Sequence, residues 1–204
     1  MKSIVILISG RGSNMQALLE ATLPVKIAAV ISNNPDAAGL EIAKKHNIET
    51  CVVDHREYPD RATFDLLLAD QIDIYRPSLV VLAGFMRVLG DGFVNKYKDK
   101  LINIHPSLLP AFPGLGTHKQ ALKEGVKIHG CTVHFVTSEV DHGPIIIQAT
   151  VPVLPGDTNE TLAARVLLQE HRIFPEAVHL FVEDRLKISG NSVKVCNKIP
   201  DNSV

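Results

Sequence analysis

The sequence has no excess of charge of one sign, few cysteines and no long apolar run. Lysine and arginine total 21, and aspartate and glutamate 22, a net charge of −1, without the basic excess typical of proteins that bind mainly nucleic acid. The three cysteines are widely spaced and form no CxxC pair, so we expect neither a disulfide framework nor a zinc site. No apolar stretch reaches the roughly 18 residues that span a bilayer, and no targeting signal precedes the first strand-like run. We therefore predict a cytoplasmic, globular protein that acts on neither membranes nor nucleic acids.

Composition and length fit one folded domain. Hydrophobic residues make up 46% of the 204 residues and charged residues 21%, which is ordinary for a protein that buries a core. Domains usually run to about 100–200 residues, and no repeat or linker divides this chain. We predict a single domain over residues 1–187, followed by a polar, weakly ordered tail over residues 188–204.

Short apolar runs alternate with helical patterns in the first half of the chain. The run over residues 4–8 is continuously apolar, as expected of a strand buried on both faces. Alternating strands and helices of this length predict an α/β fold of three layers, in which a mostly parallel, twisted sheet carries helices on both faces. The expected strands are 4–8, 27–31, 50–53 and 79–83, and the expected helices are 13–19, 39–46 and 59–76, the last with Pro59 at its first position.

The second half of the chain alternates less regularly. Asp157, with Glu160 three residues later, resembles a capping box that opens a helix. We expect this helix to end near residue 184 and to bend at Pro175. The other expected elements are helices at 91–98 and 119–123 and strands at 101–104, 128–136 and 145–153, with a proline-rich loop at 105–116.

A glycine-rich turn, Ser9-Gly10-Arg11-Gly12-Ser13-Asn14, joins the first strand to the first helix. The N–H groups of a helix N-terminus attract anions, and the Ser13 hydroxyl and Asn14 amide could add hydrogen bonds to a phosphate. Met15 stands at the third glycine position of a dinucleotide fingerprint, and no GK[ST] follows, so neither standard nucleotide loop is present. The motif alone leaves two interpretations open, a phosphate-binding loop and a tight turn capped by Ser13.

A second group of polar residues lies beside a stiff loop. Asn103 and His105 would face the same side of a strand, at the carboxyl end where open α/β sheets bind ligands. Asp141 is the natural partner, because a nearby carboxylate favours the cationic imidazole. A cationic imidazole beside an amide donor suits a developing oxyanion. A structural histidine and a turn aspartate are the alternatives. The other histidines of this half show no metal-ligand spacing, and we expect supporting or surface positions for His118, His129, His134 and His142.

Three motifs of the sequence together resemble the folate-dependent formyltransferases. Ile102-Asn103-Ile104-His105-Pro106-Ser107-Leu108-Leu109-Pro110 resembles their active-site segment, and it occurs with Gly10-Arg11-Gly12-Ser13-Asn14 and Asp141-His142-Gly143-Pro144. The similarity extends from the first strand to the helix that contains Gln169-Glu170-His171. It implies the formyltransferase fold, with a Rossmann-like N-terminal half. It also implies an enzyme of purine biosynthesis that transfers formyl from 10-formyltetrahydrofolate to the amine of glycinamide ribonucleotide without a metal.

The resemblance also implies roles for individual residues. The catalytic positions are Asn103, His105 and Asp141. The residues implied to bind the substrate phosphate are Gly12, Ser13 and Asn14, and Glu170 is implied to make a further contact with the nucleotide. The folate contacts fall on Arg61, Met86, Arg87, Val88, Leu89, Asn103 and Val140, the last within the stretch 136–141 that would line the pterin pocket.

Two positions depart from the family pattern, and three other functions compete. Leu167 stands where relatives have a glutamine, so that contact is not carried over, and His142 replaces a common glycine in the folate loop. Formyltetrahydrofolate hydrolases typically add an N-terminal domain, and methionyl-tRNA formyltransferases add a C-terminal RNA-binding domain. A non-catalytic phosphometabolite-binding protein is the alternative from another class, although an inactive relative would be expected to lose one of the three catalytic residues. A homodimer is compatible with the sequence.

Overall fold

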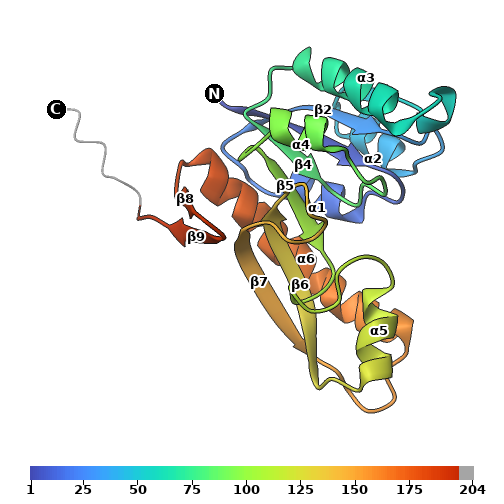
Figure 1. The fold of residues 1–204 in the computed structure, drawn as a ribbon, viewed down its shortest axis with the longest axis vertical. Coiled ribbons are helices and arrows are strands. Elements are labelled where there is room, and N and C mark those ends of the chain that lie inside the picture. Colours follow the sequence, from blue (N-terminus) through green and yellow to red (C-terminus); the bar gives the residue numbers. More distant parts are fainter. Residues whose placement is uncertain (198–204) are drawn as a thin grey trace.

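The computed structural model describes residues 1–197, and residues 198–204 of the predicted polar tail lie outside the described part. One nine-stranded sheet runs through the molecule in the order β3-β2-β1-β4-β5-β6-β7-β9-β8 (Figure 1). Helices cover both of its faces, so the predicted fold class is confirmed. No helix within residues 1–197 is long and apolar enough to cross a membrane.

Five parallel strands form the N-terminal part of the sheet. Strands β1 and β4 are buried along almost their whole length, as their uninterrupted apolar runs predicted. The chain order reverses where β1 lies between β2 and β4, and the carboxyl ends of strands at such a reversal form the usual ligand crevice of an open α/β sheet. The bounds are β1 Ser3–Ile8, β2 Lys26–Ser32, β3 Thr50–Val52, β4 Leu79–Leu82 and β5 Leu101–His105.

The C-terminal part of the sheet is mostly antiparallel. Strand β6 (Ile128–Phe135) pairs with β5 on one side and with β7 (Ile145–Pro152) on the other. A hairpin of β8 (Leu186–Ser189) and β9 (Ser192–Val195) then lies beside β7 at the edge of the sheet. The prediction of a weakly ordered tail from residue 188 is wrong for this hairpin, because its two strands satisfy each other's backbone groups.

Two hydrophobic cores fill the space between the sheet and its helices. One core packs α1, α2 and α6 against one face, and the other packs α3 and α4 against the opposite face. In Figure 1, β6, β7, α5 and the first part of α6 extend away from the parallel strands as an arm. The bounds are α1 Ser13–Glu20, α2 Gly39–Lys45, α3 Arg61–Asp73, α4 Asp91–Lys96, α5 Thr117–Glu124 and α6 Asn159–Val182.

Two helices begin at other residues than the sequence predicted. The N-cap of α3 is Asp60, whose carboxylate accepts a hydrogen bond from the Thr63 N–H at 2.8 Å, so Pro59 precedes the helix instead of opening it. The cap of α6 is Thr158, which exchanges hydrogen bonds with Thr161. Asp157 instead forms a two-pronged ion pair with Arg165.

Candidate active site

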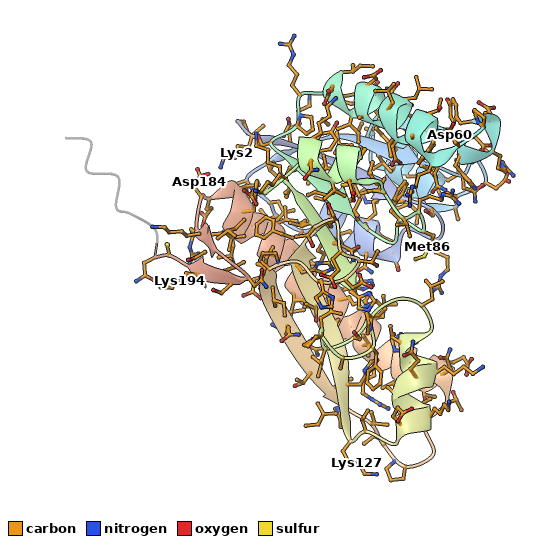
Figure 2. The ribbon with its side chains drawn as sticks, viewed as in Figure 1. Lys2, Asp60, Met86, Lys127, Asp184 and Lys194 are labelled. Carbon is orange, nitrogen blue, oxygen red and sulfur yellow. The ribbon has the colours of Figure 1, made fainter. Side chains whose placement is uncertain are left out.

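A cavity of about 720 Å³ opens at the carboxyl ends of β1 and β4, within the size range of small-molecule sites. The turn after β1, the turn after β4, the end of β5 and the first half of α6 contribute its wall. Figure 2 shows Met86 on the side of the N-terminal half that faces α5. The cavity brings together every residue to which the family resemblance assigns the nucleotide, Gly12, Ser13, Asn14 and Glu170.

The glycine-rich turn presents the N-terminus of α1 to this cavity. Gly12 has a φ of 77°, in the left-handed region, and a Cβ there would stand 2.7 Å from the Gly39 Cα. Glycine is therefore required both for the backbone turn and for the close approach to α2. No side chain caps α1, so its first N–H groups are available to an anion. This geometry favours the phosphate-loop interpretation over a turn capped by Ser13.

A buried hydrogen bond joins α1 to α6 beside the cavity. Asn14 Nδ2 donates to Glu170 Oε2 at 2.6 Å, and Glu170 is 7% exposed. Burial raises the pKa of Glu170, against the smaller lowering effect of the Asn14 amide. Because its side chain is committed to Glu170, Asn14 offers a phosphate its backbone N–H rather than its amide.

Asn103 is oriented by a histidine that sequence reasoning placed among supporting or surface groups. The register of β5 and β6 sets Asn103 opposite His134, and Asn103 Nδ2 lies 3.2 Å from His134 Nε2. His134 is 2% exposed, its Nδ1 lies 2.9 Å from the Phe135 carbonyl, and burial lowers its pKa. A neutral ring with its proton on Nδ1 satisfies both contacts, so Nε2 accepts from the Asn103 amide. His134 thus fixes the direction of that amide.

His105 is held between two acceptors. Its Nδ1 lies 3.5 Å from Asp141 Oδ1, and its Nε2 lies 3.0 Å from the Phe112 carbonyl. Asp141 also accepts a 2.8 Å hydrogen bond from the Gly114 N–H. Acceptors at both ring nitrogens suit a doubly protonated imidazole. The structure therefore brings together the predicted trio of Asn103, His105 and Asp141, and their catalytic roles stay a prediction.

The proline-rich loop after β5 is held by hydroxyl and amide groups of β6, β7 and α5. Thr132 Oγ1 donates to the Ser107 carbonyl at 2.7 Å and accepts from the Leu109 N–H at 3.1 Å. Gln148 Nε2 reaches both Thr132 Oγ1 and the Leu109 carbonyl at 2.9 Å. Thr117 Oγ1 donates to the Pro106 carbonyl at 2.7 Å. These bonds hold the backbone that carries His105.

Two more histidines lie beneath the cavity. His118 lines it, and His118 Nδ1 lies 3.2 Å from His129 Nε2. His129 is 1% exposed, and burial, more than the neighbouring His118, lowers its pKa to about 4. A neutral, buried His129 thus supports the His118 ring. No three side chains of His, Cys, Asp or Glu within residues 1–197 are grouped as metal ligands.

Within the described part of the chain, Met86 alone of the predicted folate residues belongs to the cavity lining, and the group is unequally buried. Met86 lines the cavity and is 66% exposed, whereas Leu89 is half-buried against the α3 core. Arg87, Val88 and Val140 are exposed. Arg61 lies beside Gly90, and its Nε would stand 3.8 Å from a Cβ placed there. Val140 directly precedes Asp141 in the chain, so of this group it lies next to a residue of the predicted catalytic trio.

A side chain that sequence reasoning missed helps to hold the segment over residues 86–90 in place. Asp65 of α3 is 6% exposed, and its Oδ2 accepts a 2.7 Å hydrogen bond from the Gly90 N–H. At the other end of the segment, Ser9 Oγ accepts from the Met86 N–H at 2.7 Å. Desolvation raises the pKa of Asp65. No pattern in the sequence marks Asp65, because its partner is a backbone group 25 residues away.

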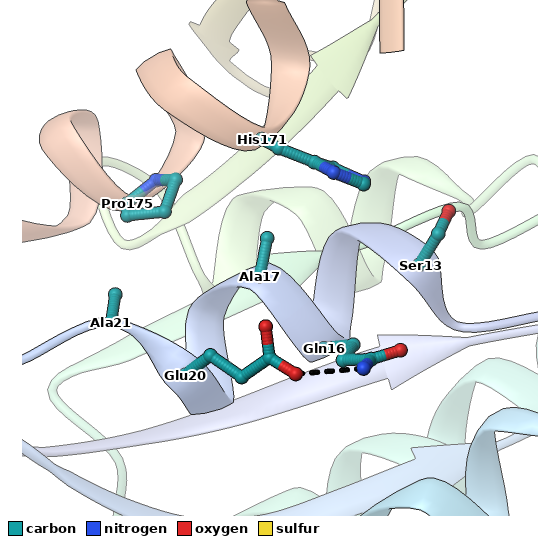
Figure 3. Close-up of a pocket in the computed structure, with 7 residues that line it drawn as sticks. All are labelled: Ser13, Gln16, Ala17, Glu20, Ala21, His171 and Pro175. Atoms are coloured by element: carbon teal, nitrogen blue, oxygen red, sulfur yellow. Dashed lines mark hydrogen bonds between the residues drawn. The ribbon is translucent and has the colours of Figure 1, made fainter. Parts of the chain in front are cut away.

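A smaller cavity of about 510 Å³ lies between α1 and α6 (Figure 3). His171 and Pro175 face Ala17 and Ser13 across it, and Gln16 donates a 2.7 Å hydrogen bond to Glu20. Its lining within residues 1–197 contains a carboxylate but neither lysine nor arginine. Its charge therefore suits a phosphate less well than the larger cavity.

Comparison with known proteins finds similarity over nearly the whole chain. Residues 2–178 match the formyl transferase family model. The chain is 49% identical over 194 residues to the phosphoribosylglycinamide formyltransferase of Escherichia coli (strain K12), covering 93% of this chain and 92% of that protein. It is 46% identical to the trifunctional purine biosynthetic protein adenosine-3 of Homo sapiens, covering 95% of this chain and 19% of that protein.

Solved structures show the same similarity. The crystal structure of glycinamide ribonucleotide transformylase 1 from Symbiobacterium toebii superposes with a TM-score of 0.94 at 50% identity, covering 97% of this chain and 95% of that one. A formyltetrahydrofolate deformylase from Pseudomonas syringae pv. tomato superposes with a TM-score of 0.89 at 29% identity, covering 96% of this chain and 66% of that one. These similarities confirm the resemblance that the three sequence motifs predicted.

Proposed function

The chain belongs to the formyl transferase family, and we propose that it transfers a formyl group from 10-formyltetrahydrofolate to the amine of glycinamide ribonucleotide. The observation that carries this proposal is that one cavity is lined both by a possible phosphate-binding helix start and by residues next to the candidate catalytic histidine. The uncapped N-terminus of α1 suits the nucleotide phosphate, and Ile104 and Pro106, the neighbours of His105, form part of the same wall. The enzyme thus acts in purine biosynthesis.

The reaction proceeds through a tetrahedral intermediate. The neutral amine attacks the formyl carbon, and the formyl oxygen becomes an oxyanion that needs hydrogen-bond donors. The Asn103 amide, directed by His134, is one donor, and the protonated His105 ring is the other. In the reacting complex the His105 Nε2–H turns from the Phe112 carbonyl to the oxyanion, while Asp141 stays at Nδ1 and favours the cation.

Collapse of the intermediate breaks the bond between the formyl carbon and the folate nitrogen. The attacking nitrogen loses one proton and the leaving folate nitrogen gains one, so the transfer needs no external acid or base. We assign the relay of this proton to the His105–Asp141 pair, 3.5 Å apart. The role of the protein is to orient both substrates and stabilise the oxyanion.

Binding of the two substrates divides between the two edges of the site. The N–H groups at Gly12, Ser13 and Asn14 hold the nucleotide phosphate, and Glu170 contacts the nucleotide within the same cavity. The folate contacts are assigned to Asn103 and to a border formed by Arg61, Met86, Arg87, Val88, Leu89 and Val140. A cytoplasmic location and a homodimer stay predictions.

Formyl transfer by the purified protein tests this function. Glycinamide ribonucleotide and 10-formyltetrahydrofolate should yield formylglycinamide ribonucleotide and tetrahydrofolate in equal amounts. Omitting the amine separates transfer from its rival, because a hydrolase would release formate from the folate alone. The similarity to a deformylase makes hydrolysis the second candidate, and the phosphate-type turn favours transfer. Folate turnover that does not depend on the nucleotide would contradict the proposal.

A further inference from the structure

We propose that Arg11 is the cationic ligand of the substrate phosphate, and that this side chain sets the affinity of the enzyme for the phosphorylated end of its substrate. The inference deepens the proposed function and rests on it. The family resemblance assigns the phosphate to Gly12, Ser13 and Asn14, which offer N–H groups and a hydroxyl but no formal positive charge. Arg11 immediately precedes them in the same turn and lines the same cavity.

A phosphate dianion bound in this cavity needs a positively charged side chain, because the lining also contains carboxylates. Two carboxylate side chains, Glu160 and Glu170, belong to the lining, and Leu167 of α6 contributes no polar atom. Within residues 1–197, Arg11 is the one lysine or arginine of this lining. The α1 N-terminus supplies a partial charge of about +0.5, so these N–H groups alone leave most of a phosphate dianion uncompensated.

Arg11 is exposed and uncommitted in the described part of the chain. It forms no hydrogen bond or ion pair with any of residues 1–197, unlike Arg56, Arg165 and Arg172, which pair with carboxylates. A long, free side chain beside the turn can fold over a bound phosphate. Its planar guanidinium matches two phosphate oxygens at once, as the ammonium of a lysine does not.

The smaller cavity supports the same assignment by contrast. It shares Ser13 with the larger cavity but carries Glu20 and His171 in place of an arginine (Figure 3). Ser13 is therefore accessible from two sides, and Arg11 marks the side on which a phosphate is favoured.

Three variants and one ligand test the role of the charge. Arg11→Gln removes the charge and keeps much of the side-chain length, Arg11→Lys keeps the charge, and Arg172→Gln removes an exposed arginine outside the cavity. Ribose 5-phosphate serves as a probe that carries the phosphate without the reacting amine. The readouts are kcat, both KM values, the inhibition constant of the probe and the dependence of each on salt.

Arg11→Gln should raise the KM for glycinamide ribonucleotide and the inhibition constant of ribose 5-phosphate together, by about 10- to 100-fold. Its kcat and folate KM should stay within about twofold, since the charge acts on bound phosphate rather than on the reacting atoms. Arg11→Lys should recover part of the affinity, and Arg172→Gln should behave as wild type. Added salt should raise the nucleotide KM of wild type more steeply than that of Arg11→Gln.

Other outcomes overturn the inference. An unchanged nucleotide KM in Arg11→Gln, or a loss in Arg11→Lys as large as in Arg11→Gln with equal salt dependence, would show that the charge does not hold the phosphate. Failure of wild type to formylate the nucleotide would instead remove the proposed function. In that case calorimetric binding of ribose 5-phosphate to wild type and Arg11→Gln decides the phosphate role separately, with equal affinities refuting it.

Discussion

Replacement of Asp141 by asparagine separates the charge of this residue from its structural contacts. Asp141 has a φ of 56°, a conformation that asparagine adopts as readily as aspartate. Asparagine also keeps an oxygen that can accept the 2.8 Å hydrogen bond from the Gly114 N–H. The loop should therefore keep its shape, while the negative charge 3.5 Å from His105 Nδ1 is lost.

Loss of this charge should lower kcat and leave the two KM values almost unchanged. Two unit charges about 4 Å apart interact by about 4 kcal/mol at the effective dielectric constant of a partly buried site, and the Asp141 side chain is 10% exposed. Loss of one oxyanion donor typically lowers kcat by about 10²–10³. We expect a decrease of that size in Asp141→Asn, because His105 then lacks the carboxylate that stabilises positive charge on its ring while it donates to the oxyanion. Both KM values should change little, since the charge acts mainly in the transition state.

Steady-state kinetics with both substrates and thermal unfolding form the assay. Glu176→Gln is the control, because Glu176 is an exposed carboxylate outside the cavity lining that lies 3.6 Å from Arg172. This control should keep wild-type kcat, and both variants should unfold near the wild-type temperature. A kcat for Asp141→Asn within about threefold of wild type would refute the electrostatic role and leave Asp141 as a turn residue.

Three further predictions follow from the contacts around the cavity. Asn14→Ala keeps the backbone N–H but removes the 2.6 Å partner of the buried Glu170, so the free energy of unfolding should fall by about 1–3 kcal/mol. The nucleotide KM should rise while the folate KM does not, because Glu170 loses the amide that orients it, and an unchanged nucleotide KM contradicts the assignment of Glu170 to the nucleotide. Asp65→Ala removes the acceptor of the Gly90 N–H and should raise the folate KM with little effect on the nucleotide KM. Asp65→Asn keeps an acceptor oxygen and should recover most of the loss. Equal effects of the two variants would contradict a positioning role for Asp65. His129 has a pKa of about 4 in the folded protein and about 6.5 in the unfolded chain. Between these pH values the unfolded chain binds more protons than the folded protein. The free energy of unfolding should therefore fall by up to about 3 kcal/mol as the pH drops from 6.5 to 4. Urea unfolding of wild type and His129→Gln across this range checks it, and parallel curves would show that His129 is not responsible.

The local pattern of residues determined the parallel part of the fold. Continuous apolar runs predicted β1 and β4, since a strand buried on both faces has no polar side to show. The glycine-rich turn after a buried strand left phosphate binding and a capped tight turn both open, and the structure places an uncapped helix start at the carboxyl end of β1. The strands and the position of the turn depend on neighbours within a few residues, so the sequence alone was enough to place them.

Helix caps and the chain end show where local reasoning fell short. Thr158 was missed in favour of the adjacent Asp157, and Asp60 in favour of a helix start at Pro59, because both neighbours match the sequence preferences of a helix N-terminus. Strands β8 and β9 pair with each other, and Ser192 of β9 also pairs with Ile145 of β7, which joins the hairpin to the edge of the sheet. A polar segment that would not hold a strand alone does so at the edge of an existing sheet.

Only the tertiary structure determined which residues of the site are hydrogen-bonded to one another. Sequence reasoning could pair His105 with Asp141 by chemistry, but the register of β5 and β6 sets His134 against Asn103. Likewise, the commitment of Asn14 to Glu170 requires α1 to lie against α6, 156 residues away in sequence. The physical reason is the same in both cases. Residue types determine which hydrogen bonds and charges are available, whereas strand register and helix packing over long sequence distances determine which of them meet.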